Sequence, residues 1–405
     1  MRRRYSRKKI LFMLTSMNIG GVEKSLISLL EILPKNEYDI TVLLLDKKGG
    51  FLKYIPNWVK VKEAEWYPKL KPVIMQPPQD TIKSYLNNKE IFKIPPFTLS
   101  YIASKRFNDR YIYYKEVMRE IPMYKEYYDV AIAYQGPTDI IDYYIANKVN
   151  ASKKISWIHF DVSKHEINEK LYKKLYKKMD KLFVVSDEAI NRLVEKIPTC
   201  ENKIERHLNV IDSDLIRKMS LSSTDFDDDF EGVKIVTVGR LSLEKGQDLA
   251  IKALSRLIDE GYNVRWYCIG EGNDRNYLEE LIRNYKLENN FFLVGNKLNP
   301  YPYILKSDIY VQPSRHEGFC LTLAEAKCLG KPIVTTGFSS AYEQIRSGHD
   351  GWIVGDNEKE LFEKISLLIE NPCQRESLSE NLYTNTINKS GDTEKFIRFI
   401  GEEGR

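Results

Sequence analysis

Short apolar runs rich in β-branched residues alternate with amphipathic helical patterns along most of the chain. Buried parallel strands are apolar throughout and their crossover helices have one apolar face, so this order predicts parallel sheets covered by helices on both sides. In the first half of the chain, the predicted elements are a helix at 22–33 and strands at 9–16, 40–45, 130–134, 155–160 and 182–186.

The same alternation resumes after a polar, acidic stretch at residues 222–229. The predicted elements here are strands at 234–238, 264–269, 291–294, 309–312 and 332–335, and helices at 247–260, 275–285 and 321–329. The predicted fold class is therefore α/β, with two Rossmann-like, doubly wound domains. Because ligands bind beyond the carboxyl ends of the strands in such sheets, we expect the two domains to face a central cleft.

The domain boundaries follow from this division. We predict an N-terminal domain at 1–210, a linker at 211–232, a second domain at 233–390, and a C-terminal tail at 391–405 that returns to the first domain. Within the first domain, residues 67–128 are rich in Tyr, Pro and Lys and lack a clean strand. We interpret this segment as an insertion of helices and loops.

Composition narrows the class of protein. The chain has 62 basic and 57 acidic residues, and this near balance does not favour nucleic-acid binding over the whole surface. Its five cysteines are odd in number and show no C-x-x-C spacing. They therefore favour neither a disulfide framework nor a zinc site, and are typical of a reducing cytoplasm.

The N-terminus places basic residues before a short apolar run at 10–14, as a secretory signal would. The run is too short for a signal, and no small-x-small cleavage site follows it. No stretch approaches the roughly 20 apolar residues of a membrane span. We therefore expect a cytoplasmic protein that can touch a bilayer without crossing it.

The candidate binding and catalytic residues lie in turns that follow predicted strands of the second domain. The turn at 239–246 (GRLSLEKG) holds Arg240 and Lys245, five positions apart. A fork-shaped guanidinium binds phosphate oxygens in pairs and an ammonium adds a compact charge, so this pair suits a diphosphate. Two solvated surface cations are the alternative.

A second turn, Gly270-Glu271-Gly272, allows a ligand to approach the backbone closely. Arg275 stands where a dinucleotide-binding fingerprint has its third glycine. The turn therefore gives little support to a nicotinamide-binding site.

A third turn, at 313–326 (PSRHEGFCLTLAEA), joins a strand to a helix and carries Glu317 and Glu325. Free N–H groups at the helix start, together with the helix dipole, favour an anion such as phosphate. The two carboxylates are placed to accept hydrogen bonds from sugar hydroxyls. The alternative is that Glu317 caps the helix and Glu325 faces solvent.

The three turns together resemble the retaining glycosyltransferases of family four, which have the GT-B fold and include enzymes of bacterial capsular and surface polysaccharides. The resemblance rests on G-R-L-x-x-E-K-G, on G-E-G, and on P-S-R-x-E-G-F followed by E-A, and it covers most of residues 234–354. The first domain matches less closely, through Gly20-Gly21 and the W-I-H-F-D run at 157–161.

The resemblance implies a role for the charged residues. Arg240 and Lys245 would hold the donor diphosphate and stabilise the charge that develops as the sugar leaves. Glu317 would contact hydroxyls of the transferred sugar, and Glu325 would hold the ribose hydroxyls. His159 would reach toward the donor sugar from the first domain; a core histidine at a strand end is the alternative.

The resemblance also implies a wider donor-binding set. Its members are Gly20, Gly21, Gly270, Glu271, Lys297, Leu298, Ser314, Gly318, Phe319, Cys320, Leu321, Thr322 and Glu325. The amides at 318–322 would cap the phosphates, and Lys297 and Leu298 would border the nucleobase. Cys320 stands where a small residue such as glycine is common, and since an amide is what matters there, we do not interpret it as a nucleophile.

The implied reaction moves a hexose or N-acetylhexosamine from a nucleoside diphosphate sugar, with UDP favoured over GDP, to a glycan or polyprenyl-diphosphate-linked acceptor in surface polysaccharide biosynthesis. The anomeric configuration would be retained without a metal or a further cofactor. D-x-D patterns at 212–214 and 225–229 resemble metal sites of another transferase fold, but we interpret them as a solvated acidic linker. A GT-B nucleotide-sugar epimerase or phosphorylase and a non-catalytic nucleotide-sugar-binding subunit stay open.

A basic amphipathic helix is predicted around residues 164–181. Ile167, Leu171, Leu175 and Met179 recur every four positions, with lysines on the remaining faces. Such a helix can rest on an anionic bilayer, which predicts peripheral contact at the inner face of the plasma membrane. The alternative is an ordinary helix that packs its apolar stripe on the sheet.

Overall fold

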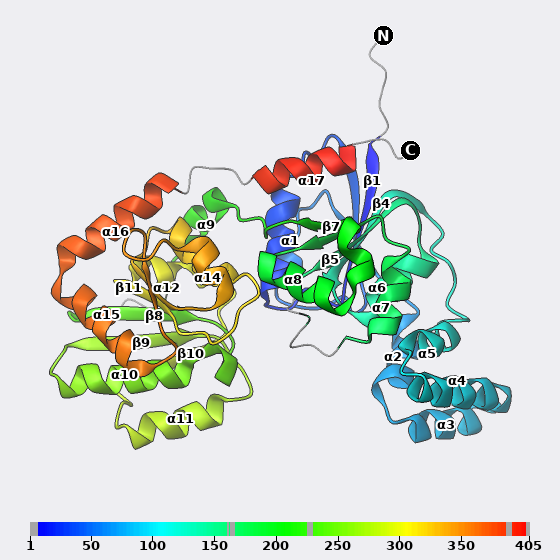
Figure 1. The fold of residues 1–405 in the computed structure, drawn as a ribbon, viewed down its shortest axis with the longest axis horizontal. Helices are drawn as coiled ribbons and strands as arrows, with labels where there is room; N and C mark the ends of the chain where they lie inside the picture. Colours follow the sequence, from blue (N-terminus) through cyan, green and yellow to red (C-terminus); the bar gives the residue numbers. More distant parts are fainter. Residues whose placement is uncertain (1–6, 160–161, 163–166, 225–229, 386–390, 402–405) are drawn as a thin grey trace, which may run out of the picture. The chain divides into compact units, whose positions relative to one another are not determined.

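The structure, a computed structural model, describes residues 7–159, 162, 167–224, 230–385 and 391–401. It divides into two compact units, one of Met1–Leu208 with Glu394–Arg405 and one of Asn209–Thr393. Each unit is a parallel sheet with helices packed on its faces, as Figure 1 shows. The predicted α/β class with two Rossmann-like, doubly wound units is confirmed.

Unit 1 contains a seven-stranded parallel sheet. In spatial order, its strands are β3 (Lys60–Glu63), β2 (Tyr38–Leu44), β1 (Lys8–Leu14), β4 (Tyr127–Gly136), β5 (Asn150–Ile158), β6 (Lys181–Val184) and β7 (Ile204–Arg206). The central strand β1 is buried on both faces from Ile10 to Leu14, which is why its sequence is a continuous apolar run.

Helices and short 3-10 turns connect these strands. They are α1 (Gly21–Ile32), η1 (Leu52–Tyr54), α2 (Tyr67–Met75), α3 (Pro78–Asn87), η2 (Ile91–Lys93), α4 (Ile94–Arg106), α5 (Arg110–Val117), α6 (Asp139–Lys148), α7 (Glu169–Tyr176), α8 (Asp187–Lys196), η3 (Pro198–Lys203) and, from the C-terminus, α17 (Gly391–Gly401). Helix α17 packs on this unit, where the Phe396 ring lies 5.5 Å from that of Trp157 and Lys153 donates to the carbonyl of Phe399.

The predicted insertion is helical, as its composition suggested. Helices α2 to α5 form a helical arm, residues 67–120, that extends from the sheet in Figure 1. The predicted end of the insertion at 128 is too late, because Tyr127 and Tyr128 already belong to β4. Burial of Tyr128 against the sheet explains why this aromatic stretch is a strand.

The amphipathic helix around 164–181 is shorter than predicted, and α7 spans Glu169–Tyr176. Leu171, Tyr172, Leu175 and Met179 are buried in the core of unit 1, so the helix packs its apolar stripe on the protein. The prediction that this apolar stripe contacts a bilayer is therefore wrong. Within the described parts of the chain, no helix combines the length and apolar character needed to cross a membrane.

Unit 2 contains a six-stranded parallel sheet. In spatial order, its strands are β10 (Phe291–Gly295), β9 (Val264–Ile269), β8 (Val233–Val238), β11 (Ile309–Gln312), β12 (Ile333–Thr336) and β13 (Trp352–Val354). Its helices are α9 (Ser213–Ser220), η4 (Leu243–Lys245), α10 (Gln247–Asp259), α11 (Arg275–Asn284), α12 (Tyr301–Lys306), α13 (Leu321–Cys328), α14 (Ser339–Gln344), α15 (Glu358–Glu370) and α16 (Pro372–Asn385). Two separate apolar cores, one on each face of the sheet, hold these helices.

The predicted linker at 211–232 is wrong over its first half, which forms helix α9 of unit 2. Ile216 of this helix is buried in the core, and Arg217 donates to the carbonyl of Cys328. The first D-x-D pattern is local structure, because Asp212 caps the helix by accepting from the amide of Leu215 at 2.9 Å. The second pattern, at 225–229, lies outside the described residues.

Candidate functional site

Strands β8 and β11 lie where the strand order of unit 2 reverses. From β8, the strands β9 and β10 follow on one side, and β11, β12 and β13 on the other. Connections that leave two such strands in opposite directions leave room for a ligand beyond the strand ends. The turn after β8 carries Arg240 and Lys245, and the turn after β11 carries Glu317, so the sheet brings two predicted turns to one edge.

Two glycines allow the three predicted turns to pack closely against one another. Gly246 has a φ of +70°, and a Cβ there would lie 1.8 Å from the carbonyl oxygen of Pro313. Gly270 has a φ of +147°, and a Cβ there would lie 2.0 Å from the carbonyl oxygen of Gly239. Any other residue would be strained and would clash with backbone at both positions, so the glycines permit this close packing.

Lys245 and Glu317 form the centre of this edge, with Nζ 2.7 Å from Oε2. The other carboxylate oxygen of Glu317 accepts from Ser314 Oγ at 2.8 Å and from Gln312 Nε2 at 3.4 Å. Burial acts to lower the pKa of Lys245, but the charge and hydrogen bond of Glu317 outweigh it and the pKa is raised. The ammonium therefore stays positive and is held in one place.

Arg240 directly follows the strand-end glycine and is exposed. Its carbonyl accepts from the buried Gln247 side chain at 2.9 Å, which fixes the backbone at the start of the turn. Among the described residues, no carboxylate pairs with its guanidinium. The side chain is thus available to a ligand, unlike that of Lys245, which an internal carboxylate holds.

Helix α13 begins beside Glu317. Its N-cap, Cys320, has a φ of +61° and its side chain makes no capping bond, so the alternative in which Glu317 caps this helix does not hold. The left-handed backbone explains why a glycine is common at this position. Burial raises the pKa of the Cys320 thiol far above its usual value, so the thiol is not a nucleophile.

The amides at 318–322 surround the helix start. Within the described residues, these N–H groups donate to no backbone or side-chain acceptor. They include Gly318, Phe319, Leu321 and Thr322 from the predicted donor set. An anion at this point would meet unsatisfied donors and the positive end of the helix.

Glu325 lies on the buried side of α13, so the alternative of a solvent-facing helix residue does not hold either. Its side chain is only 3% exposed, and its Oε1 accepts from Tyr301 Oη at 2.9 Å. Burial, followed by the charge of Glu325, raises the pKa of Tyr301 well above its usual value, so the phenol remains a donor. Tyr301 thereby fixes one oxygen of the carboxylate.

Glu271 takes part in an ion pair that the sequence did not suggest. Arg275 donates to both oxygens of its carboxylate, at 2.6 and 2.9 Å, and this pairing lowers the pKa of Glu271. Arg275, which replaces the third glycine of a dinucleotide fingerprint, therefore has a structural partner in the same turn. Nearby, Lys297 lies 5.4 Å from the ring of Tyr303, and Leu298 is half-buried after β10.

Arg315 and Asp248 form a clamp that no sequence pattern predicted. The guanidinium donates to both carboxylate oxygens at 2.8 Å, and the Arg315 amide donates to the carbonyl of Glu244 at 2.8 Å. Asp248 is buried in the first turn of α10. The clamp fastens the turn of Lys245 to the turn of Glu317, and only its bidentate geometry reveals it.

Gln312 was also missed, because its position at the end of an apolar strand suggests core. It is fully buried, its amide donates to Ser314 Oγ at 2.8 Å, and its Oε1 accepts from Tyr310 Oη at 2.6 Å. Thr322 donates to the same oxygen at 3.3 Å. Gln312 therefore connects the Glu317 turn with the start of α13.

Unit 1 has its own reversal point, between β1 and β4. There, the hydroxyl and amide of Thr15 both donate to Gln135 Oε1, at 2.6 and 2.8 Å. Gly20 is the N-cap of α1, and Gly21 is exposed at its first position. The predicted glycine loop thus lies at the carboxyl edge of this sheet.

His159 lies just past the end of β5 and is 7% exposed. Its ring stacks on Trp157 at 5.9 Å and contacts Tyr134 at 4.8 Å. This environment is that of a histidine packed into an aromatic cluster at a strand end. Phe160 and Asp161, which complete the matched run, lie outside the described residues.

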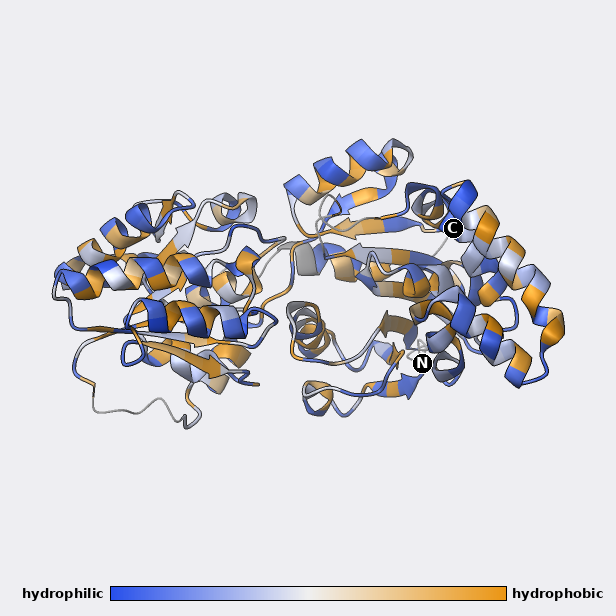
Figure 2. Cartoon of the chain, turned by 90° about the horizontal axis from the view of Figure 1, so that it is seen from below, coloured by the Kyte–Doolittle hydropathy of each residue, from blue (hydrophilic) through white to orange (hydrophobic). Residues whose placement is uncertain are grey.

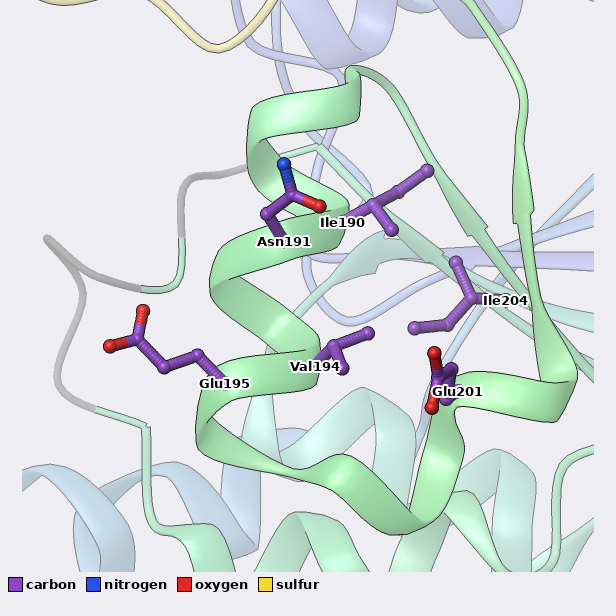
Figure 3. A pocket seen from close by; sticks show the side chains of 6 residues that line it. All are labelled: Ile190, Asn191, Val194, Glu195, Glu201 and Ile204. Carbon is purple, nitrogen blue, oxygen red and sulfur yellow. The ribbon is translucent and has the colours of Figure 1, made fainter.

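A hollow of about 460 Å³ lies elsewhere on unit 1, between α8, η3 and β7 (Figure 3). Its lining side chains are Ile190, Asn191, Val194, Glu195, Glu201 and Ile204. These include two carboxylates and no basic group, which does not suit a phosphorylated ligand. The edge around Lys245 and Glu317 is therefore the better candidate site. Within the described part of the chain, no group of three or more His, Cys, Asp or Glu side chains is arranged to hold a metal ion.

Comparison with known proteins adds three findings. Residues 227–385 match the family model described as "Glycosyl transferases group 1". This range contains all three turns and the Lys245–Glu317 centre.

Curated relatives match over part of their length. An uncharacterized glycosyltransferase of Methanocaldococcus jannaschii is 27% identical over 223 residues, which are 51% of this chain and 54% of that protein. The N-acetylgalactosamine-N,N'-diacetylbacillosaminyl-diphospho-undecaprenol 4-alpha-N-acetylgalactosaminyltransferase of Campylobacter jejuni is 28% identical over 234 residues, 57% of this chain and 62% of that protein. The chain thus spans little more than half the length of these curated relatives.

Solved structures match nearly the whole chain. HepE from Anabaena, in complex with UDP and glucose, has a TM-score of 0.69 and 17% identity, covering 98% of this chain and 100% of that one. TarM from S. aureus, in a complex that contains UDP, has a TM-score of 0.69 and 12% identity with the same coverage. At these identities the likeness shows the fold, and the predicted GT-B fold is confirmed.

Proposed function

We propose that the chain transfers a hexose or N-acetylhexosamine from a nucleoside diphosphate sugar, because residues 227–385 match the family model of group 1 glycosyl transferases. A UDP-sugar is the favoured donor, since the fold matches proteins crystallised with UDP. The acceptor is a glycan or a lipid-linked saccharide in surface polysaccharide biosynthesis. Support for a lipid-linked acceptor comes from the Campylobacter relative, whose name contains diphospho-undecaprenol.

One observation carries the proposal: a half-buried ammonium, Lys245, lies 2.7 Å from Glu317 beside the unsatisfied amides at 318–322. A diphosphate bound there meets Lys245, the exposed Arg240 and the start of α13. These groups stabilise negative charge as the bond from the anomeric carbon to the diphosphate oxygen breaks. In this proposal they need neither a metal nor a further cofactor.

The two carboxylates act at opposite ends of the donor. Glu317, held by Ser314 and Gln312, accepts hydrogen bonds from hydroxyls of the transferred sugar. Glu325, with one oxygen fixed by Tyr301, accepts from the ribose hydroxyls. Retention of the anomeric configuration belongs to the same proposal, as does a reaction at the cytoplasmic face of a membrane.

The test is a screen of nucleotide sugars by thermal stabilisation, followed by a transfer assay with the ligand that stabilises most. A ligand at a hundred times its Kd adds about 2.7 kcal/mol to the unfolding free energy. We expect UDP-sugars to stabilise the protein and Lys245→Ala to reduce the effect. A protein that no nucleoside diphosphate sugar stabilises would contradict the proposal.

A further inference from the structure

Helix α4 of the helical arm carries two large aliphatic residues on its exposed side. Pro95, Leu99, Ile102 and Arg106 are exposed and follow one another at spacings of four, three and four, which is one face of a helix. Leu99 is 68% exposed and Ile102 is 55% exposed. An ordinary surface helix carries polar residues on its exposed side, so an apolar stripe there calls for an explanation.

The buried face of α4 is occupied by other residues. Phe97, Ser100 and Ser104 are buried, and Phe97 packs edge-on against the rings of Tyr85 and Tyr113. The arm therefore has its own small core, and the exposed stripe is not needed to hold it together. Leu99 and Ile102 can change without loss of packing.

Neighbouring residues extend the apolar stripe at both ends of α4. Phe92, in the turn η2 before the helix, is 69% exposed, and Phe107, directly after it, is 56% exposed. We call Phe92, Leu99, Ile102 and Phe107 the α4 face. In Figure 2 the helices of the arm, at the right of the view, carry hydrophobic (orange) segments. Adjacent exposed side chains of this size are characteristic of an interaction surface.

The charge of the arm identifies the kind of partner. Residues 67–120 contain ten basic and five acidic residues. All five acids are paired with a lysine or arginine; their contacts are Asp80–Lys83, Glu90–Lys93, Glu120–Lys93, Asp109–Lys174 and Glu116–Arg119. Five cations, Lys69, Lys89, Lys105, Arg106 and Lys115, have no carboxylate partner among the described residues. The surface is therefore cationic beside its apolar stripe.

Helix α7 adds to the same cationic edge. Lys170 donates to the carbonyl of Phe107 at 2.6 Å, which places an α7 lysine at the C-terminal end of the α4 face. Lys105 and Arg106 lie in the last turn of α4 itself. Lys170 thus borders an apolar surface, although the apolar stripe of α7 is buried in the core.

We propose that the α4 face docks on an anionic lipid bilayer, with Leu99 and Ile102 in the interface and Lys105, Arg106 and Lys170 beside the headgroups. Exposed apolar side chains flanked by lysine and arginine are what an interfacial helix uses to bind such a surface. Anionic headgroups attract each nearby lysine and arginine, and this attraction strengthens binding of the protein to the bilayer. Salt screens the attraction. This docking does not depend on the proposed sugar transfer.

The test is cosedimentation with vesicles of phosphatidylglycerol and phosphatidylcholine, compared with vesicles of phosphatidylcholine alone. We expect the wild-type chain to bind the anionic vesicles and Leu99→Gln/Ile102→Gln to bind at least about tenfold more weakly. The matched control is Leu221→Gln, because Leu221 is 80% exposed in unit 2 and should not matter. Lys105→Glu/Arg106→Glu should weaken binding at low salt, whereas Arg283→Glu/Lys286→Glu, at and just after the C-terminal end of α11, should not.

Vesicle binding by Leu99→Gln/Ile102→Gln that equals the wild type would overturn the proposal. So would a wild-type chain that ignores anionic vesicles but forms a dimer that this variant dissociates, since the partner would then be a second copy. Melting curves with and without UDP on the same samples show whether each variant folds. They also test donor binding separately, so failure of the proposed function and failure of docking are distinguishable.

Discussion

Lys245 Nζ lies 2.7 Å from Glu317 Oε2, across 72 positions of sequence. The carboxylate is itself fixed by Ser314, so the ammonium is held at the strand ends in a defined position. A cation that is already oriented costs no reorganisation when negative charge develops on a leaving group. The pair is therefore the part of the fold on which the proposed chemistry most depends.

Gly246→Ala should damage both stability and donor binding. The substitution places a Cβ 1.8 Å from the carbonyl oxygen of Pro313 at a φ of +70°. Left-handed strain alone costs about 1–2 kcal/mol, and relief of the clash must move the Lys245 turn. The matched control is Gly261→Ala, which has a φ of +88° and no atom within 4 Å. Urea unfolding should show a larger loss for Gly246→Ala; equal losses would contradict the role given to this glycine.

Arg315→Lys should lower turnover although Arg315 is not placed at the reacting atoms. Lysine cannot reproduce the two parallel bonds to Asp248, so the turns of Lys245 and Glu317 should shift relative to each other. Small misplacement of reacting groups costs up to about a hundredfold in rate, and we expect at least about tenfold in kcat.

Arg346→Lys is the control for this clamp, because Arg346 also pairs with a buried carboxylate, Asp350, in the same unit. Both variants should lose similar stability, but only Arg315→Lys should lose turnover at saturating donor. Equal kcat values in the two variants would show that the Arg315–Asp248 pair contributes to stability but not to turnover.

The sequence predicted the central strands well because burial on both faces leaves continuous apolar runs, as in Ile309–Gln312. The sequence pattern did not predict strand β3. Its four residues, Lys60–Glu63, lie at the edge of the sheet, and none of their side chains is buried. The detail of the helical arm could not be predicted because α4 exposes Leu99 and Ile102 and buries two serines beside Phe97. Periodicity assigns the wrong side of such a helix to the core.

The site shows a similar division. Residues within one turn, such as Arg240 and Lys245, are recognisable because their spacing is local. The clamp between Arg315 and Asp248 joins residues 67 positions apart and exists only once the sheet has formed. Gln312 ends an apolar strand, and its hydrogen bonds depend on Tyr310 and Thr322 being folded beside it.

Asp142 should make the stability of unit 1 depend on pH. Burial raises the pKa of this fully buried carboxyl to about 7, although Ser156 and the amide of Thr138 donate to it. The native state therefore keeps a proton that the unfolded chain releases near pH 4. Between about pH 4 and pH 7 the folded state binds more protons, so this group's contribution to stability falls as pH rises.

The measurement is the melting temperature of the wild type and of Asp142→Asn at pH 5 and pH 8. Asparagine does not titrate, so the wild type should lose stability relative to the variant on going from pH 5 to pH 8. A difference between wild type and Asp142→Asn that stays constant with pH would contradict the raised pKa.

The most direct test of the central claim is kcat for sugar transfer with saturating donor in Arg240→Ala and Lys245→Ala, with Lys252→Ala on α10 as the control. If these two cations stabilise the leaving diphosphate, each variant should lose roughly a hundred- to a thousandfold in kcat, and the control should match the wild type. Near-normal kcat in both site variants would contradict the account.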